Sequence, residues 1–375
     1  MPFKASLITC FLLLAGPLCA GPSIDSTGTQ ALLFDAEDVL DITIPLHFKD
    51  LCRPREDENC DFISTTLNYP GPAGETVSLP IEIKVRGGWR SLSTNCSAPL
   101  LWIRFEDERT AGTPFEGQEL LPLTTHCGPG FSLEAISNRP PKSSWQEYLL
   151  KEYLAQRLYG QFTEASLRSR LIRVHYPDPD KPRHIIHNYA FFTEHFDDMA
   201  ARINTVRLER GSFDHEKLDN RAADILALFQ FMIGNTDWSI VRERNTILVE
   251  TPDGRQVPVP YDFDMSGLVN AHYAGPAPGL PIDSVRQRHY LGFCHPEQDW
   301  DELFEFFTAR REAVMDLAAR VPDLDEDSSG SARSFLEQFF SLLESEQARS
   351  EKIVSACKPW PPSTVDHTTP PGKRR

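Results

Sequence analysis

Residues 224–264 read DILALFQFMIGNTDWSIVRERNTILVETPDGRQVPVPYDFD, and this stretch joins regular structure to polar side chains that can do chemistry. The apolar run through residues 225–233 predicts a buried helix, and Gly234 predicts its end because glycine commonly terminates helices. The polar loop that contains Asp237 follows directly. We therefore expect Asp237 to begin a loop at the end of a rigid element.

The second half of this stretch predicts a β-hairpin. Apolar strands at residues 245–250 and 257–264 flank Asp-Gly at residues 253–254, which is the strongest short-range hairpin signal. Pro258 and Pro260 cannot donate hydrogen bonds to a neighbouring strand, so the second strand is expected at a sheet edge or in an irregular form.

The hairpin predicts a cluster of cation ligands. With a two-residue turn, Asn245 lies directly opposite Asp262, and Asp264 points to the same face two residues further on. An amide oxygen and two carboxylates are ligands that hold Mg²⁺, and a further Asp can accept the proton of an attacking hydroxyl. We assign Asp237 as the candidate base, Asn245 and Asp262 as metal ligands and Asp264 as a second bridge. A register slip of one residue would break the pair.

Each of these residues also has a structural explanation. An Asp that follows a helix is commonly a turn former, and Asp-x-Asp also occurs in calcium loops and sugar-nucleotide sites. The ordering of all of them by one hairpin favours a functional site.

The rest of the chain predicts an α+β fold with two lobes. Strand-like runs occupy residues 42–48, 78–85, 100–105, 171–175 and 187–194. Helical patterns occupy residues 143–159, 221–233, 299–319 and 332–356. We expect a β-rich lobe over residues 31–195, a helix-rich lobe over 196–357 and a Pro-rich disordered tail over 358–375.

Composition and targeting signals limit the partners and the compartment. The 375 residues carry 38 Lys and Arg against 54 Asp and Glu, a net charge of −16 that repels nucleic-acid phosphates, so we expect no nucleic-acid partner. Residues 1–20 resemble a secretory signal cut near Ala20, which predicts a secreted or periplasmic protein. Lipidation of Cys19 is the alternative. No later segment is long and apolar enough to span a membrane.

Six cysteines remain beyond the signal, and an even number in an exported protein favours disulfides. No pair has the CxxC spacing of a metal site. Our preferred pairing joins Cys52 with Cys60, Cys96 with Cys127, and Cys294 with Cys357, although the sequence permits 15 connectivities.

Several segments also carry a family resemblance. They are IEIKVRGGWR (residues 81–90), LWIRF (101–105), NYAFFTEH (188–195), Asn235-Thr236-Asp237 with Asn245, and PYDFD (260–264). Together they resemble the CotH-like spore-coat kinase family over residues 80–270. The resemblance implies a divergent protein-kinase-like fold that uses ATP and Mg²⁺ or Mn²⁺ to modify protein hydroxyls, with Asp237 at the catalytic position and Asp262 at the metal position.

A kinase-type site also needs a carboxylate that orients the phosphate-binding cation. Helical periodicity places Glu152 on the inward arc of the first helix, where it requires a partner. Arg104 or Lys84 is the expected partner and cofactor-binding cation, and a structural ion pair with Arg157 or Arg173 is the alternative.

Departures from the family pattern keep other functions open. Arg104 stands where family members have lysine, the loop at residues 86–89 lacks GxGxxG, and Asp237 and Asn245 are further apart than in ordinary kinases. One alternative is a non-catalytic, pseudokinase-like envelope protein that binds a cation or a partner in its acidic cleft. A metal-dependent glycosyltransferase using residues 262–264 is less favoured because no nucleotide-binding βαβ unit precedes them.

Overall fold

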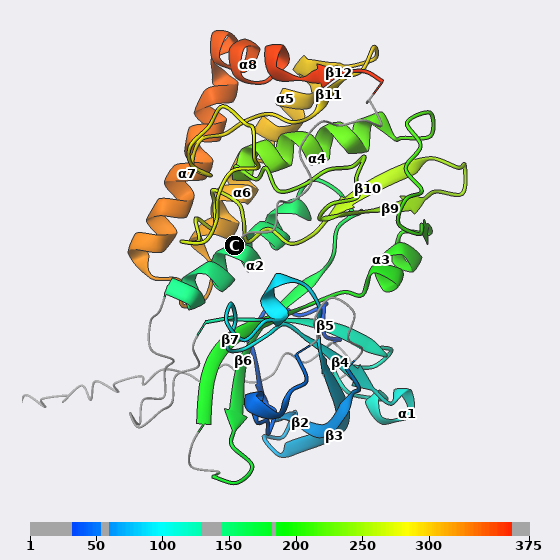
Figure 1. Ribbon diagram of the computed structural model, residues 1–375, viewed down its shortest axis with the longest axis vertical. Helices are drawn as coiled ribbons and strands as arrows, with labels where there is room; N and C mark the ends of the chain where they lie inside the picture. Colours follow the sequence, from blue (N-terminus) through cyan, green and yellow to red (C-terminus); the bar gives the residue numbers. More distant parts are fainter. Residues whose placement is uncertain (1–31, 54–59, 129–143, 182–184, 362–375) are drawn as a thin grey trace, which may run out of the picture.

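Seven strands of the first half of the chain close into a barrel (Figure 1). This computed structural model describes residues 32–53, 60–128, 144–181 and 185–361, so the expected signal peptide and nearly all of the expected tail lie outside the described residues. The barrel strands are β1 (Leu40–Thr43), β2 (Ile63–Pro70), β3 (Thr76–Val85), β4 (Leu101–Phe105), β5 (Leu120–Thr125), β6 (Ser169–Pro177) and β7 (Ile185–Thr193).

The strand order around the barrel is β1-β2-β3-β4-β5-β7-β6, and β1 closes it by pairing in parallel with β6. Alternation decides which side chains enter the barrel: in β3, Leu79, Ile81 and Ile83 are buried, whereas Glu82 and Lys84 lie on the outer face. The first expected strand, residues 42–48, is shorter than predicted and ends at Thr43. Mixed α and β structure is as expected, and the assignment of two kinase lobes stays a prediction.

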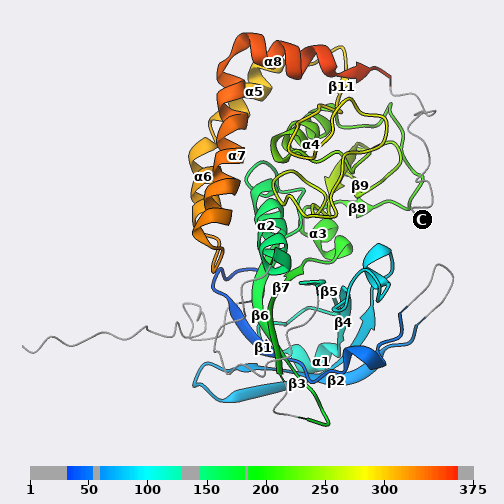
Figure 2. The same cartoon turned by 60° about the vertical axis from the view of Figure 1, so that its left-hand side comes forward.

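Helices make up most of the rest, and all except the short α1, which lies beside the barrel strands, stand together at one end of the barrel (Figure 2). They are α1 (Asp107–Thr110), α2 (Ser144–Tyr159), α3 (Phe196–Arg202), α4 (Asn220–Ile233), α5 (Trp300–Thr308), α6 (Arg311–Ala319), α7 (Glu326–Glu344) and α8 (Glu346–Lys352). Short 3-10 turns are η1 (Phe48–Asp50), η2 (Trp89–Ser91) and η3 (Val354–Ala356). None of the helices that the structure describes is long and apolar enough to cross a membrane.

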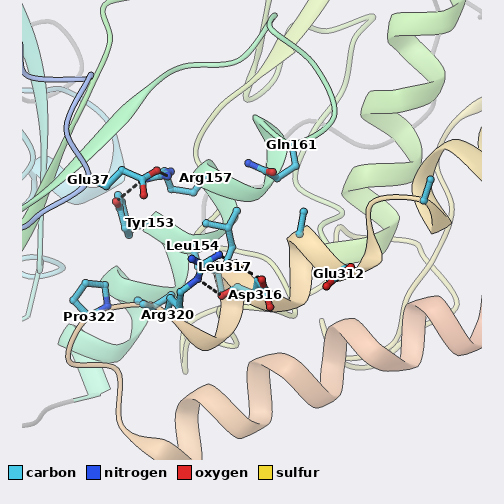
Figure 3. A pocket seen from close by; sticks show the side chains of 13 residues that line it. Glu37, Tyr153, Leu154, Arg157, Gln161, Glu312, Asp316, Leu317, Arg320 and Pro322 are labelled. Carbon is cyan, nitrogen blue, oxygen red and sulfur yellow. Dashed lines mark hydrogen bonds and ion pairs between the residues drawn. The ribbon is translucent and has the colours of Figure 1, made fainter.

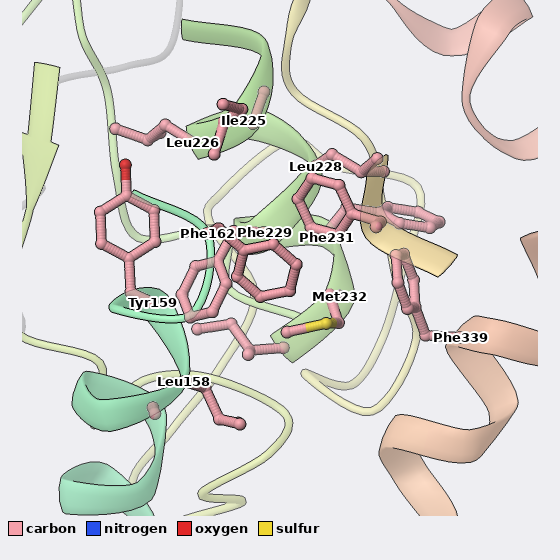
Figure 4. Close-up of a cluster of buried hydrophobic side chains, with 14 of the residues drawn as sticks. Leu158, Tyr159, Phe162, Ile225, Leu226, Leu228, Phe229, Phe231, Met232 and Phe339 are labelled. Atoms are coloured by element: carbon pink, nitrogen blue, oxygen red, sulfur yellow. The ribbon is translucent and has the colours of Figure 1, made fainter. Parts of the chain in front are cut away.

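Helix α2 packs against both halves of the molecule. Leu149 and Leu150 lie in a buried cluster with side chains of β6 and β7. Further along the helix, Leu158 and Tyr159 join a larger cluster centred on α4, where Phe229 packs against Tyr159 (Figure 4). Because the helix is fixed at both ends, the side chains in its middle are held at the junction between barrel and helices.

Two long helices predicted from periodicity are each divided in the structure. The helix expected over residues 299–319 breaks between α5 and α6 at Arg310, whose guanidinium donates to the carbonyls of Gln161 and Phe306. The helix expected over 332–356 begins earlier, at the cap Asp325, and breaks at Ser345, which caps α8. The Ser-Ser-Gly-Ser run after Asp327 lies within α7.

Two small sheets complete the structure. β8 (Val206–Arg207), β9 (Thr246–Glu250) and β10 (Gln256–Pro260) form a sheet in the order β10-β9-β8, so the proline-containing strand is at an edge, as expected. β11 (Phe293–Cys294) pairs with β12 (Lys358–Pro359).

The three expected disulfides are present. Cys52 is bonded to Cys60, Cys96 to Cys127 and Cys294 to Cys357, with Cα–Cα distances of 5.7, 4.7 and 5.3 Å. Such bonds are compatible with an oxidising compartment outside the cytosol.

Candidate active cleft

Helix α4 delivers the chain to Asp237. Asp219 caps the helix at its start by accepting from the amide of Ala222, and Gly234 ends it in the left-handed conformation, with φ of 66°. A Cβ at Gly234 would also lie 2.8 Å from the carbonyl oxygen of Val285, so both the backbone angle and the close packing require glycine. The helix end is therefore fixed, and Asp237 starts its loop from a rigid support.

Asp237 is held by three neighbours. Its amide donates to the side-chain oxygen of Asn235 at 2.9 Å, which forms a tight turn. Asn245 donates its side-chain Nδ2 to the Asp237 carbonyl oxygen at 2.8 Å and to Oδ2 at 3.1 Å. Arg244 forms an ion pair with Oδ1. Neither bond from Asn245 uses its amide oxygen, so that atom is the one that can bind a cation.

The register predicted for the hairpin is wrong by one residue. Gln256 pairs with Glu250, and Tyr261 donates to the carbonyl of Asn245 at 3.0 Å, so Tyr261 rather than Asp262 is opposite Asn245. The cause is a three-residue loop at residues 252–254 in which Gly254 adopts φ of 83°, in place of the expected two-residue turn.

The backbone nevertheless brings Asp262 and Asn245 into neighbouring positions. Both residues adopt positive φ, 48° for Asn245 and 62° for Asp262, and both belong to residue types that tolerate the left-handed region. Such angles cluster at binding and catalytic sites because the surrounding structure must impose them. Asp237 is close enough to Asp262 for its charge to raise the pKa of the Asp262 carboxyl.

A buried arginine gathers the other carboxylates. The guanidinium of Arg90, in η2, contacts Glu152 Oε2 at 3.2 Å, Asp262 Oδ1 at 3.3 Å and Asp264 Oδ2 at 2.5 Å. The Tyr273 hydroxyl also hydrogen-bonds Asp264. The Arg90 guanidinium therefore joins α2, the loop after β3 and the segment after β10. Glu152 is inward as predicted, but its partner is Arg90.

This cluster shifts the ionisation of its members. Burial raises the pKa of Glu152 to about 8, and the negative charges of Asp264 and Asp262 add to the effect against the opposing Arg90. The Asp262 side chain is 39% exposed and lines a small cavity. Burial there, with the charge of Asp264, raises the pKa of Asp262 to about 7. Glu152 and Asp262 together therefore retain a proton near neutral pH.

Arg104 and Lys84, the expected partners of Glu152, lie elsewhere. Both lie on the outer face of the barrel, as Trp102 does, and their contacts there are with other side chains. There the Nε of Arg104 donates to Glu82 at 2.7 Å and its guanidinium lies over the ring of Phe62, which Lys84 also approaches at 5.5 Å. The prediction that either one pairs with Glu152 is wrong.

A small cavity lies where the barrel meets the helical half. It has a volume of about 40 Å³ and is lined by β4, β5 and α2, by the junction between β7 and α3, and by the residues after β10. Glu152 and Asp262 line it, together with Arg86, whose guanidinium lies 5.1 Å from the centre of the Trp102 ring. Arg86 is thus the cation that faces this space, whereas Arg90 is committed to carboxylates.

A larger cavity lies away from this chemistry. It occupies about 560 Å³ between α2 and α6, on a different face of α2 from Glu152 (Figure 3). Its charged lining residues are largely paired: Arg157 with Glu37 at 2.6 Å and Arg320 with Asp316 at 3.5 Å. Size alone does not identify the site, because the smaller cavity contacts the clustered carboxylates.

The candidate ligands do not form an all-protein metal cage. Among the described residues, three potential ligand atoms come together only at His47, Asp178 and Asp180. None of these three residues lines the cleft cavity. In the cleft, Arg90 lies between Glu152, Asp262 and Asp264, and Asp264 is further occupied by Tyr273. The residues present fit a cation that takes few protein oxygens and completes its shell with water and phosphate, as Mg²⁺ commonly does.

Arg90, Arg86 and Arg244 were not predicted as site residues. Arg90 is 62 residues from Glu152 and 172 from Asp262 in sequence, so no local spacing relates them. One signal in the sequence could have pointed to a buried arginine: several carboxylates were predicted to face inward, and each buried carboxylate needs a cation as partner.

No protein-family model and no curated protein sequence matches the chain. Among solved structures, the chain is similar to the Helicobacter pylori proinflammatory kinase CtkA, with 9% sequence identity over 85% of this chain and 96% of that one, and a TM-score of 0.32. At this TM-score the similarity establishes neither a common fold nor a function for this chain.

Proposed function

We propose that the chain is an exported, CotH-like kinase-fold phosphotransferase that uses ATP and Mg²⁺ or Mn²⁺ to phosphorylate a protein hydroxyl. The observation that carries the proposal is the bond from Asn245 to Asp237, with Asp262 beside them at the mouth of the cleft. This arrangement supplies a base and two cation ligands within one site, which phosphoryl transfer requires. The sequence resemblance to the CotH-like family supports the same assignment.

In this proposal Asp237 accepts the proton of the acceptor hydroxyl. Asn245 and Arg244 hold its carboxylate, so that its orientation is set before the acceptor binds. The amide oxygen of Asn245 and the carboxylate of Asp262 would hold the divalent ion. When bound, the divalent ion supplies positive charge that neutralises the phosphates.

The cations of the cleft divide two further tasks. Arg86 lines the cavity and binds phosphate oxygens, whereas Arg90 keeps Glu152 and the segment around Asp262 in place. A cavity of about 40 Å³ holds little more than one water, so nucleotide binding requires the barrel and the helical half to separate at this junction.

The test is transfer from γ-labelled ATP, in Mg²⁺ or Mn²⁺, to a mixed acceptor protein rich in Ser and Thr. We expect labelling by the native chain and a loss of at least about 100-fold in Asp237→Asn, the range typical of a missing general base. Asp237→Asn should keep its thermal shift with ATP and metal, because it removes the base and leaves the ligands. Asn245→Gly accepts the φ of 48° but lacks the amide, so it should lose both.

The matched control is Asp253→Asn, an exposed hairpin carboxylate that contacts the turn residues Thr251 and Arg255. It should label at the native rate. The proposal fails if the native chain shows no thermal shift with ATP and metal, or if Asp237→Asn labels as fast as the native chain.

One observation favours a second function, a non-catalytic protein that binds a cation or a partner. Arg90 already contacts Asp262 and the cavity is small, which is what a cleft that no longer admits nucleotide would have. Calcium-selective binding, with native behaviour in Asp237→Asn, would support this alternative.

A further inference from the structure

Two histidines face each other on the outer surface of the barrel, remote in the fold from the cleft residues. His175 in β6 and His187 in β7 are directly opposite in the antiparallel register. Their Nδ1 atoms are in hydrogen-bonding contact, with ring centroids 4.6 Å apart and ring planes inclined at 78°. Cross-strand neighbours are held side by side by the strand ladder, and an ion bonded to both Nδ1 atoms would replace their hydrogen bond and hold the rings further apart.

A carboxylate orients one of the rings. The Nε2 of His175 lies 3.5 Å from Asp41 Oδ1, on the neighbouring strand β1. Asp41 is itself anchored, because the NH1 of Arg173 contacts both of its oxygens at 3.0 and 3.2 Å. A ring nitrogen that faces a carboxylate carries the proton, which leaves the lone pair of His175 on Nδ1, toward His187. This is the arrangement in which a second carboxylate supports a metal-binding histidine.

The surroundings suit a cation with an incomplete protein shell. The side chain of His175 is 25% exposed and His187 is partly buried, so water can reach the pair. Two imidazole nitrogens with water select borderline transition ions over Mg²⁺ or Ca²⁺, which prefer oxygen.

We propose that His175 and His187 bind a divalent transition ion such as Zn²⁺ through their Nδ1 atoms, with Asp41 as the carboxylate that orients His175. The site ties β6 to β7 on the face of the barrel and is separate from the Asp262 cleft. It is also separate from His47, whose two ring nitrogens face two different carboxylates, Asp178 and Asp180, and therefore bridge them as ion-pair partners.

The test measures Zn²⁺ and Mg²⁺ binding by calorimetry to the full chain after treatment with EDTA. We expect Zn²⁺ to bind at one site and to raise the unfolding temperature, while Mg²⁺ in this role does neither. His187→Gln should abolish the Zn²⁺ site, and Asp41→Asn should weaken it by about 10- to 100-fold, the usual cost of a lost supporting carboxylate. With Cu²⁺, electron paramagnetic resonance should show two nitrogen ligands that become one in His187→Gln.

His47→Gln is the matched control, since it removes the other histidine of this side of the barrel that faces carboxylates. It should bind Zn²⁺ as the native chain does. The proposal is overturned if the native chain does not bind Zn²⁺, if His187→Gln binds it unchanged, or if the site is lost in His47→Gln instead. A fold defect in His187→Gln is detected by its circular dichroism, and His175→Gln then provides the second loss-of-ligand variant. None of these outcomes depends on ATP, so the failure of this inference is distinct from failure of the proposed kinase activity.

Discussion

The two sides of the cleft differ in how deeply their ion pairs are buried. Arg90, with only 8% of its side chain exposed, is surrounded by three carboxylates from distant parts of the chain. Across the cleft, Asp237 is paired with Arg244, which is 47% exposed and comes from the same loop. The Arg90 side commits its charges to holding the barrel, α2 and the β10 segment together, whereas the charges of the Asp237 side belong to a single loop. We expect replacements on the Arg90 side to lower mainly the free energy of unfolding, and replacements on the Asp237 side to affect mainly catalysis.

Replacement of Arg90 should have the largest effect. Arg90→Met keeps much of the apolar volume but leaves the buried Glu152 and Asp264, and the partly exposed Asp262, without their cation. Removing one partner of a buried ion pair commonly costs about 3–5 kcal/mol, because the remaining charges stay desolvated. Urea unfolding at pH 8 measures the loss.

Arg104→Met is the control, because Arg104 also pairs with a glutamate but on the outer face of the barrel, where 43% of its side chain is exposed. We expect it to cost about 0–1 kcal/mol, as exposed ion pairs do. If both variants lost the same free energy of unfolding, burial would not explain the strength of the Arg90 ion pairs.

The ionisation of Glu152 provides the next largest effect. Its pKa rises from a usual value of 4.5 to about 8 in the folded protein, so between these values the folded state binds more protons than the unfolded state. The free energy of unfolding must then fall as pH rises from about 5 to 8, by up to about 1.4 kcal/mol per pH unit for one proton. Glu152→Gln cannot take up this proton, so its unfolding free energy should fall less over the same range.

Glu147→Gln, on the more exposed side of the same helix, is the control and should follow the native curve. The quantity to compare is the difference between variant and native unfolding free energies at pH 5, 6, 7 and 8. A difference for Glu152→Gln that does not change with pH would contradict a shared proton in the Arg90 cluster.

Sequence reasoning performed well where the determinants were local. The start of α2, the end of α4 at Gly234 and the inward direction of Glu152 all follow from periodicity and caps. The hairpin itself was predicted, but its register depended on whether Gly254 closes a two- or three-residue loop, and Asp-Gly permits both.

The partner of Glu152 could not be found in this way. Arg90 follows a Gly-Gly-Trp loop that has neither helical nor strand periodicity, and its contacts form only when the barrel, α2 and the β10 segment are assembled. Arg104 and Lys84 were plausible partners by type, but Arg104 pairs with Glu82, and both cations lie near the ring of Phe62. Residue type therefore indicated that a cation was needed, and tertiary structure decided which one.

The smallest effect is expected on the Asp237 side, and salt distinguishes it from the Arg90 side. Arg244→Gln removes an ion pair in which one partner is 47% exposed, so the loss should be below about 1 kcal/mol at low ionic strength. In 1 M NaCl, where screening acts over about 3 Å, the loss should vanish, whereas that of Arg90→Met should persist because buried pairs are screened much less. Urea unfolding of both variants at two salt concentrations makes the comparison. A loss in Arg244→Gln that survives high salt would show that Asp237 is held in a desolvated pair, and the cleft would then have two structural sides and no accessible base.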